Sequence, residues 1–317
     1  MVAFERLKGR IRRSPFLFNL CLRIYASAWL RFTNRRAFLR YQFIDALKKL
    51  SGLVTGNGLV GGLMTDDGDF FLRMPDGIFL FYNFRHPQWT IGDGQSLECK
   101  SGESAMHLEQ FIQNKLNDNS VYFDVGANNG YFYALKVARR HPGCRVHAFE
   151  PDVRIFGPLM KNVAFNGAAN VVLIPIALSD SDGTGRMPAN MGASGYLLSS
   201  KTESTLQVEV RVTTLDNYVS QENIHRLDLI KVDIEGGEYR FIKGSEVTLR
   251  KLRPLVIVEL REELLRRSHA SVDKVVDVMG SLDYVGYRVS DHVDAVFLPR
   301  EKSAPIYSVN RSWLEPI

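Results

Sequence analysis

Residues 124–130 read DVGANNG, and they lie where a β-rich run, residues 121–125, ends and a helix is expected to begin at about Tyr131. The two glycines, Gly126 and Gly130, let the backbone turn sharply and approach a ligand closely. Ligands of open α/β sheets bind at the carboxyl ends of the strands, which is the position of this loop. The stretch therefore predicts a ligand-binding turn on an α/β sheet.

On both sides of this loop, short β-rich runs alternate with stretches that are long enough for crossover helices. Such alternation is typical of a parallel sheet with helices on both faces. The expected parallel strands are 121–125, 145–149, 171–177, 227–232 and 255–260. Helices are expected at 103–116 and 271–282, and two final strands at 287–289 and 295–298.

The loop differs from a dinucleotide-binding loop, which has the pattern GxGxxG and seats a pyrophosphate. It opens with Asp124, whose carboxylate repels phosphate but suits the ammonium group of a methionine moiety. Glu150 ends the second strand about twenty residues later, where an acid can accept both hydroxyls of a ribose. Taken singly, the loop can be only a turn and Glu150 only a surface acid. Together they predict a nucleoside cofactor, with Ser179 and Asp180 at the level expected for its base.

The fourth strand leads into a cluster of charged residues, Lys231, Asp233, Glu235 and Glu238. Lys231 and Asp233 share one face of the strand by alternation, and the two glutamates follow in the loop. Burying such charges is costly unless they pair, and Lys231 paired with one of the acids meets that need. The cluster predicts a catalytic site, and a structural ion-pair network is the alternative.

These motifs, in this order, resemble those of the FkbM family of methyltransferases. The matching blocks are 124–128 with Gly130, then 148–151, 177–180, 214–216 and 228–238, and the resemblance covers about residues 103–300. It implies an α/β, class I methyltransferase, Rossmann-like fold, with a mostly parallel seven-stranded sheet whose last strand is antiparallel. It also implies S-adenosylmethionine as the cofactor and O-methylation of sugars, polyketide-type metabolites or similar hydroxylated acceptors.

The resemblance assigns roles to individual residues. The expected cofactor-binding set is Asp124, Gly126, Asn128, Gly130, Glu150, Ser179 and Asp180. Asp233, Glu235 and Glu238 match the family's acidic motif and form, with Lys231, the expected catalytic set. Asp233 or Glu235 is expected to take the proton of the acceptor hydroxyl, and Glu259 is the next candidate for this base. Lys231 is expected to position the carboxylate or to stabilise the developing alkoxide. No metal ligand is assigned, because the spacing of the acids does not demand Mg²⁺.

Basic residues are concentrated at the N-terminus of the 317-residue chain. Residues 1–50 carry twelve Lys and Arg and two acids, so subtraction from the totals of 40 and 35 leaves 28 basic and 33 acidic residues after position 50. Within 16–32 the run is apolar except at every fourth position, which is typical of a helix lying in a membrane interface. Residues 10–36 are therefore expected to contact an anionic membrane surface, and a helix packed on protein is the alternative. Arg23 argues against a membrane span or a secretory signal.

The expected organisation is a basic helical segment at 1–50, a β-rich extension with a hairpin at 51–102, a methyltransferase domain at 103–300 and a tail at 301–317. The three cysteines are scattered, so they indicate neither a disulfide framework nor a metal site. This fits a cytoplasmic protein, with or without peripheral membrane contact. The oligomeric state stays open.

The predicted function is methyl transfer to a small-molecule or glycan acceptor bound near loop 187–205, and three other functions are alternatives. The missing GxGxxG pattern disfavours an NAD-dependent oxidoreductase. The acidic remainder of the chain disfavours a nucleic-acid methyltransferase. The intact acidic cluster disfavours a noncatalytic membrane-associated scaffold.

Overall fold

The computed structural model describes residues 61–65, 68–74, 76–83, 103–188, 197 and 207–317. Its contacts divide the chain into two compact units, Met1–Cys99 with Ala164–Asn166, and Lys100–Val163 with Gly167–Ile317. The basic segment 1–50, with the expected membrane helix, and most of loop 187–205 lie outside the described residues, so their roles stay predictions. Among the helices that are described, none has the length and apolar character needed to cross a membrane.

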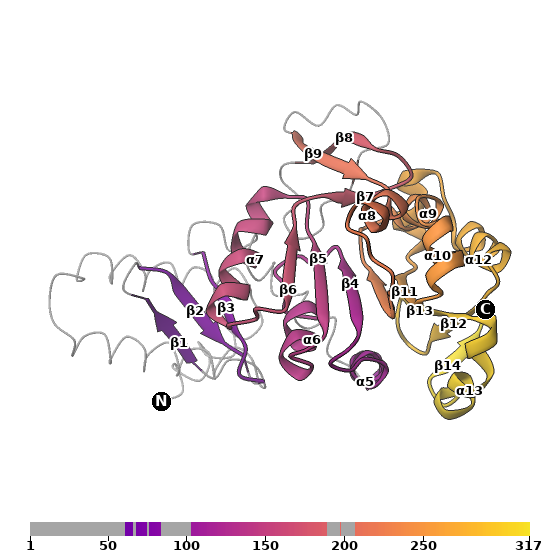
Figure 1. The fold of residues 1–317 in the computed structure, drawn as a ribbon, viewed down its shortest axis with the longest axis horizontal. Coiled ribbons are helices and arrows are strands. Elements are labelled where there is room, and N and C mark those ends of the chain that lie inside the picture. The colour runs from indigo at the N-terminus through magenta and orange to yellow at the C-terminus, as the bar shows by residue number, and fades with distance from the viewer. Residues whose placement is uncertain (1–60, 66–67, 75, 84–102, 189–196, 198–206) are drawn as a thin grey trace, which may run out of the picture. The chain divides into compact units, whose positions relative to one another are not determined.

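The first unit holds a three-stranded antiparallel sheet in the order β1-β2-β3 (Figure 1). Its strands are β1 (Gly61–Met64), β2 (Phe70–Arg73) and β3 (Phe79–Phe81). The pairing of β2 with β3 confirms the expected hairpin, and Gly77 has φ +81° in its turn. Phe71 stacks on Phe165 with ring centroids 3.9 Å apart, so the hairpin packs through an aromatic contact. The sequence does not predict β1, because its glycines are poor strand formers.

The second unit is built on an eight-stranded sheet in the order β14-β12-β13-β11-β10-β4-β5-β6. The strands are β4 (Val121–Val125), β5 (Arg145–Phe149), β6 (Val171–Ile174), β10 (Leu229–Val232), β11 (Leu255–Glu259), β12 (Tyr284–Val289), β13 (Asp294–Pro299) and β14 (Leu314–Pro316). The pairings of β4, β5, β6, β10 and β11 are parallel, and β13 is antiparallel to β11 and β12. The expected fold class is confirmed, with β14 as an additional edge strand.

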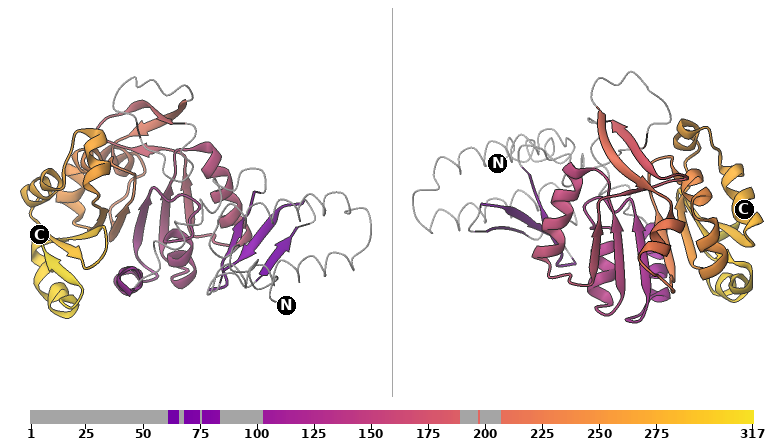
Figure 2. Two further views of the ribbon diagram at one scale, coloured as in Figure 1. Left: turned by 180° about the vertical axis from the view of Figure 1, so that it is seen from behind. Right: turned by 45° about the horizontal axis from the view of Figure 1, so that its top comes forward.

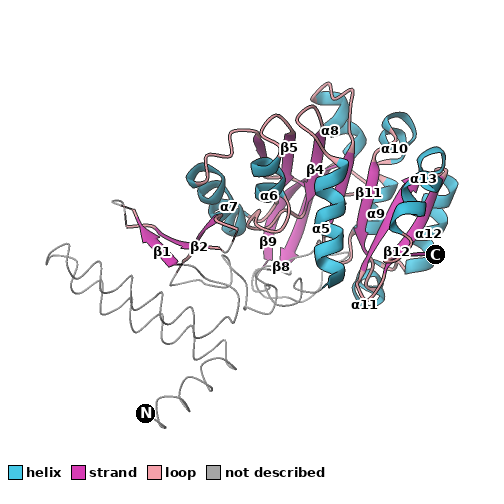
Figure 3. Cartoon of the chain, turned by 90° about the horizontal axis from the view of Figure 1, so that it is seen from below, coloured by secondary structure: helices cyan, strands magenta, loops and turns pink. Residues whose placement is uncertain are grey.

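Helices lie on both faces of this sheet, as expected for a doubly wound α/β fold (Figure 3). They are α5 (Glu103–Lys115), α6 (Ala134–Arg140), α7 (Val153–Phe165), α8 (Leu215–Gln221), α9 (Glu238–Lys243), α10 (Glu246–Leu252), α11 (Glu262–Leu265), α12 (Val272–Ser281) and α13 (Arg300–Asn310). The central strands β10 and β11 are buried along their whole length, because helices cover both of their faces.

The block 214–216 caps helices. Thr214 is the N-cap of α8 and accepts the N–H of Asn217 at 3.1 Å. The carboxylate of Asp216 accepts the N–H groups of Val247 and Thr248 at 3.1 and 2.7 Å, in the first turn of α10. Both contacts satisfy N–H groups that a helix N-terminus leaves without partners. This block thus joins two helices of the unit.

A second, three-stranded sheet has the order β7-β9-β8 and consists of β7 (Ala177–Leu178), β8 (Gly183–Pro188) and β9 (Gln207–Thr213). It lies at the end of the large sheet where the parallel strands have their carboxyl ends (Figures 1 and 2). The prediction of one strand over 171–177 is wrong, because the chain leaves the large sheet after Ile174 and continues as β7 in the second sheet. Pro175 explains the break, since proline cannot donate a ladder hydrogen bond.

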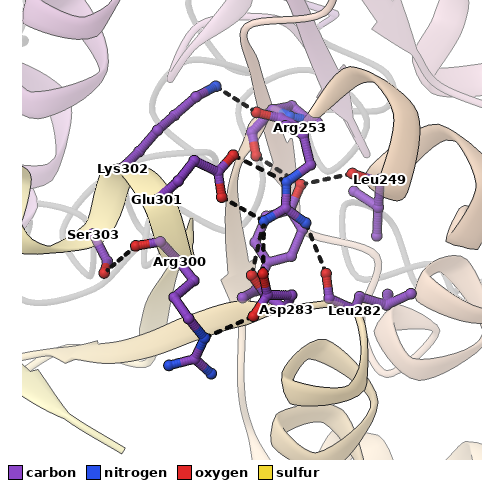
Figure 4. A network of polar contacts seen from close by, with 10 residues as sticks. Leu249, Arg253, Leu282, Asp283, Arg300, Glu301, Lys302 and Ser303 are labelled. Carbon is purple, nitrogen blue, oxygen red and sulfur yellow. Dashed lines mark hydrogen bonds and ion pairs between the residues drawn. The ribbon is translucent and has the colours of Figure 1, made fainter.

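The residues after 300 form α13 and β14 and belong to the second unit, where the sequence predicts a tail. Arg253 ties this region to the rest (Figure 4). Its Nε and Nη2 donate to Glu301 at 3.1 and 2.6 Å, and its Nη1 donates to the carbonyl oxygen of Leu282 at 2.8 Å. Lys302 donates in turn to the carbonyl oxygen of Arg253 at 2.7 Å. The hydrogen bonds from Arg253 lower the pKa of Glu301 to about 2.

Replacing Arg253 by alanine is expected to lower the free energy of unfolding by about 1–3 kcal/mol, since hydrogen bonds to charged groups contribute this much when partly exposed. The control is Arg250→Ala, an exposed arginine of α10. Denaturant unfolding at several pH values measures both. The folded-state pKa of Glu301 lies below its ordinary value of 4.5, so the difference between the variants should be full above pH 4.5 and shrink as the pH falls toward 2. Equal stability of the two variants would contradict the expectation.

Candidate active site

The glycine loop connects β4 to α6 and packs directly against the end of β10. Gly126 and Ala127 donate their backbone N–H groups to the carbonyl oxygen of Phe149 at 3.1 and 2.9 Å. Gly126 has φ +83°, and a Cβ there would lie 1.9 Å from the carbonyl oxygen of Asp233. Only glycine fits this position, because any side chain would clash with backbone. The loop and the acidic segment after β10 are therefore direct neighbours.

Asp124 and Asn128 are held by backbone contacts at the carboxyl end of β4. Asp124 is 2% exposed, and its Oδ2 accepts the N–H of Ala134 at 3.0 Å, in the first turn of α6. Asn128 has φ +54°, a conformation that asparagine adopts more readily than most residues. Its N–H donates to Oε2 of Glu150 at 3.1 Å. The loop is thereby connected to the acid that follows the neighbouring strand.

Glu150 lies immediately after β5 and is 6% exposed. Its Oε1 accepts the N–H of Asp152 at 2.9 Å, and its Oε2 accepts that of Asn128. Burial raises the pKa of Glu150 to about 7, although the two backbone hydrogen bonds oppose the shift. A carboxylate offers about four acceptor sites, so both oxygens keep capacity for a further donor. The geometry suits an acid that receives hydroxyl groups.

Ser179 and Asp180 follow β7. Ser179 is buried, donates its N–H to the carbonyl oxygen of Thr213 at 3.0 Å and donates its hydroxyl to Oδ1 of Asp180 at 3.3 Å. Asp180 is exposed, with Nε of Arg240 3.9 Å from its Oδ2. A Cβ on Gly244 would lie 1.9 Å from the carbonyl oxygen of Ser179. These two residues thus contact the end of α9, and their predicted role at the cofactor base stays a prediction.

Lys231 is fully buried in β10 and lies among carboxylates. Its Nζ lies 3.0 Å from Oδ1 of Asp294 and 3.6 Å from Oδ2 of Asp233, and it donates to the carbonyl oxygen of Val232 at 3.2 Å. Burial lowers the pKa of Lys231, but Asp294 and Asp233 outweigh burial and raise it well above its ordinary value. Lys231 is therefore a fixed positive charge behind Asp233.

Sequence reasoning missed Asp294, the closest acid to Lys231. It opens β13, is 3% exposed, and its Oδ2 lies 3.0 Å from Nδ1 of His292. Burial raises the pKa of Asp294, but Lys231 and His292 outweigh burial and the net shift is downward. One feature of the sequence could have indicated Asp294. It is an acid that directly precedes the apolar run 295–298, and the structure shows that this strand is buried throughout.

Three acids meet where β10 and β11 end. Asp233, Glu235 and Glu259 each place one carboxylate oxygen within 4.8 Å of the others. Glu235 has φ +57°, which turns the loop after Asp233. Oε1 of Glu259 lies 3.1 Å from Nε of Arg261, and burial together with the charge of Asp233 raises the pKa of Glu259 to about 9. The structure thus brings together Asp233 and Glu235, the two predicted candidates for the base, and Glu259, the third candidate.

Glu238, the remaining member of the predicted catalytic set, is 1% exposed. Its Oε1 accepts the N–H groups of Ile234 and Gly236 at 3.1 and 3.2 Å, which holds the loop after β10 in shape. Burial raises its pKa to about 7, although these backbone hydrogen bonds oppose the shift. Its contacts explain why an acid follows the loop, and a direct part in catalysis stays a prediction.

The chain has a mostly parallel sheet, a glycine loop after one strand and a buried acid after the next. This is the arrangement of a Rossmann-like methyltransferase. Residues 124–289 match the family model described as the methyltransferase FkbM domain. The chain belongs to this family and is a methyltransferase. This confirms the family that the sequence motifs predicted.

Three curated proteins illustrate the relationship. The 31-O-demethyl-FK506 methyltransferase FkbM of Streptomyces tacrolimicus is 28% identical over 205 residues, which cover 55% of this chain and 75% of that protein. The 2-O-methyltransferase NoeI of Sinorhizobium fredii is 25% identical over 52% of this chain and 73% of its own. The hexuronic acid methyltransferase AglP of Haloferax volcanii is 26% identical over 52% of this chain and 62% of its own.

Among solved structures, the methyltransferase FkbM of Methylobacillus flagellatus is similar, with 18% identity and a TM-score of 0.41. The match covers 57% of this chain and 44% of that one, so this chain spans less than half of that structure's length.

Proposed function

We propose that this protein transfers a methyl group from S-adenosylmethionine to a hydroxyl oxygen of a sugar, glycan or lipid-like acceptor. The observation that carries the proposal is the direct packing of Gly126 against the carbonyl group of Asp233. This packing sets the loop expected to bind cofactor next to the acidic cluster, which contains Asp233 and Glu235, the two candidates for receiving a proton. Methyl transfer needs little else, since alignment of donor and acceptor supplies much of the rate acceleration.

The residues at the ends of β4 and β5 fit the cofactor. Both oxygens of Glu150 keep acceptor capacity after binding one backbone N–H each, which suits the two hydroxyls of a ribose. Gly126 lets the loop lie directly against the backbone of Asp233, and the carboxylate of Asp124 suits a positively charged group. When bound, S-adenosylmethionine supplies a methyl group that its sulfonium makes electrophilic.

The acidic cluster supplies the proton acceptor. A sugar hydroxyl is a weak acid, so a positioned base assists by removing its proton as the new bond forms. Asp233 and Glu235 are the two candidates, since both lie after β10 beside the glycine loop. The ammonium group of Lys231, 3.6 Å from Asp233, holds that carboxylate in place. Lys231 is fully buried, so positioning a carboxylate fits it better than direct contact with the acceptor.

The names of relatives support oxygen as the accepting atom. Two relatives are named for O-methylation, a 31-O-demethyl-FK506 methyltransferase and a 2-O-methyltransferase, and a third is a hexuronic acid methyltransferase. These acceptors belong to those proteins. They favour a hydroxylated acceptor for this chain without selecting one.

The test is calorimetric titration with S-adenosylmethionine, S-adenosylhomocysteine and NAD. Glu150→Ala is expected to weaken binding of the first two by about 100-fold, since two hydrogen bonds to a charged acceptor contribute about 3 kcal/mol together. Glu150→Gln keeps an acceptor for one backbone N–H and controls for a folding defect, and exposed Glu222→Ala is the matched surface control. Binding of NAD alone would overturn the proposal. Absence of binding to all three would favour the noncatalytic scaffold.

A further inference from the structure

Asp233, Glu235 and Glu259 form a compact group of oxygen atoms at the carboxyl ends of β10 and β11. One carboxylate oxygen of each lies within 4.8 Å of the other two. The register of the strands produces this arrangement, because Val232 pairs with Val258 and the residues that follow each are Asp233 and Glu259. Glu235 joins them because its left-handed conformation, φ +57°, turns the chain. The cluster is therefore set by backbone geometry.

A separate feature of Glu259 points to a missing ligand. Its side chain is 6% exposed, and Oε2 is buried without a hydrogen-bond partner among the described residues. Leaving a buried polar atom without a partner destabilises the fold, and more so when the group is charged. The other oxygen, Oε1, is occupied by Arg261 at 3.1 Å. The orphan oxygen therefore belongs to a carboxylate that faces two further acids.

Acidic side chains are crowded around this cluster. Four acids gather here, namely Asp233, Glu235, Glu259 and Asp294, against the two cations Lys231 and Arg261. Lys231 lies closer to Asp294 than to Asp233, at 3.0 against 3.6 Å, so its charge is shared. Carboxylates this close together repel one another unless a positive charge lies between them. A divalent cation held among these carboxylates would remove that repulsion.

We propose that Asp233, Glu235 and Glu259 bind a hard divalent cation of the Mg²⁺ class. All three ligand atoms are carboxylate oxygens, the type that selects Mg²⁺, Mn²⁺ and Ca²⁺ over softer metals. The inference rests on the proposed function, which it deepens: a hydroxyl oxygen beside the cation becomes a stronger acid, so the proton is lost more readily. Each acid contributes one oxygen to the cation. Asp233 can therefore bind the cation through one oxygen and accept a proton on the other.

The probe is Mn²⁺, added to full-length protein that has been freed of metal with EDTA and dialysed. Electron paramagnetic resonance of free Mn²⁺ reports binding, and displacement by Mg²⁺ reports the class of ion. Wild-type protein is expected to bind one ion. Glu259→Gln and Glu235→Gln should each weaken binding by about tenfold or more, since even loss of an outer-shell partner costs 10–100-fold. Glu263→Gln removes an exposed acid four residues after Glu259 and should leave the affinity unchanged.

Three results would overturn the inference: no Mn²⁺ bound by the wild type, the same affinity in Glu259→Gln and Glu235→Gln as in wild type, or failure of Mg²⁺ to displace Mn²⁺. Thermal unfolding of each variant shows whether it is folded, and half-exposed Glu235 gives a second test if Glu259→Gln unfolds. Titration with S-adenosylmethionine on the same samples separates the two proposals. Cofactor binding without Mn²⁺ binding overturns the cation site alone, whereas Mn²⁺ binding without cofactor binding supports the site and overturns the methyl-transfer proposal.

Discussion

Replacing Lys231 by methionine is expected to lower the free energy of unfolding by about 3–5 kcal/mol, the typical cost of removing one partner of a buried ion pair. The reason lies in what the substitution leaves behind. Asp294 is 3% exposed and would lose the ammonium group 3.0 Å away, while methionine fills the volume without compensating the charge. Denaturant unfolding at neutral pH measures the loss. Lys251→Met, an exposed lysine of α10, should change stability by less than about 0.5 kcal/mol.

A second substitution tests the explanation. Asp294→Asn removes the stranded charge, so the double variant Lys231→Met with Asp294→Asn should recover part of the stability that Lys231→Met loses. Such recovery is a positive coupling of the kind that double-mutant cycles measure between contacting residues. Additive losses would show that the two side chains do not stabilise each other, and the assignment of Lys231 to a buried pair would be wrong.

The same pair should respond to pH. The folded-state pKa of Asp294 is lower than its ordinary value of 3.8, so its contribution is present above pH 3.8 and is lost as the pH falls through the lower, folded-state pKa. The wild type should therefore lose its advantage over Lys231→Met in acid. An advantage that stays constant from neutral pH to pH 2 would indicate a packing effect instead of a charge effect.

The fold was predictable because its signals are local. The loop at 124–130 and the alternating strands depend on neighbouring residues, and β4 and β5 have the bounds expected from the sequence. Glu150 could be found in the same way, since its position relative to the loop follows from the length of one β-α-β unit.

What the sequence did not predict depends on contacts between distant segments. Lys231 and Asp294 are 63 residues apart, and nothing near Lys231 indicates which acid lies closest. The hydrogen bonds of Glu238 to Ile234 and Gly236 are local, but they exist only once the left-handed turn at Glu235 has formed. The edge strand β14 has three residues, too few for a periodic pattern.

Asp233→Asn and Glu235→Gln are expected to separate cofactor binding from catalysis. Loss of a general base typically slows turnover about 10²–10⁴-fold, and one of the two variants should show this while binding S-adenosylmethionine as the wild type does. Release of S-adenosylhomocysteine with a panel of hexoses, hexuronic acids and lipid-linked sugars measures turnover. Glu263→Gln, an exposed acid on α11, is the control and should turn over at the wild-type rate.

The choice of substitution also distinguishes a base from a metal ligand. The amide oxygen of asparagine can still bind a hard cation, but it cannot take up a proton. Asp233→Asn should therefore keep more of its Mn²⁺ affinity than of its turnover if Asp233 is the base, and lose both together if it acts only by holding the ion.

Normal turnover in both variants would move the base to Glu259. With no cation bound, burial and the charge of Asp233 raise the pKa of Glu259 to about 9, so this carboxyl group is protonated at neutral pH and cannot accept a proton until the pH is higher. A base of this kind makes the rate climb with pH up to about 9. A rate that has levelled off well below pH 9 would exclude Glu259 as the base.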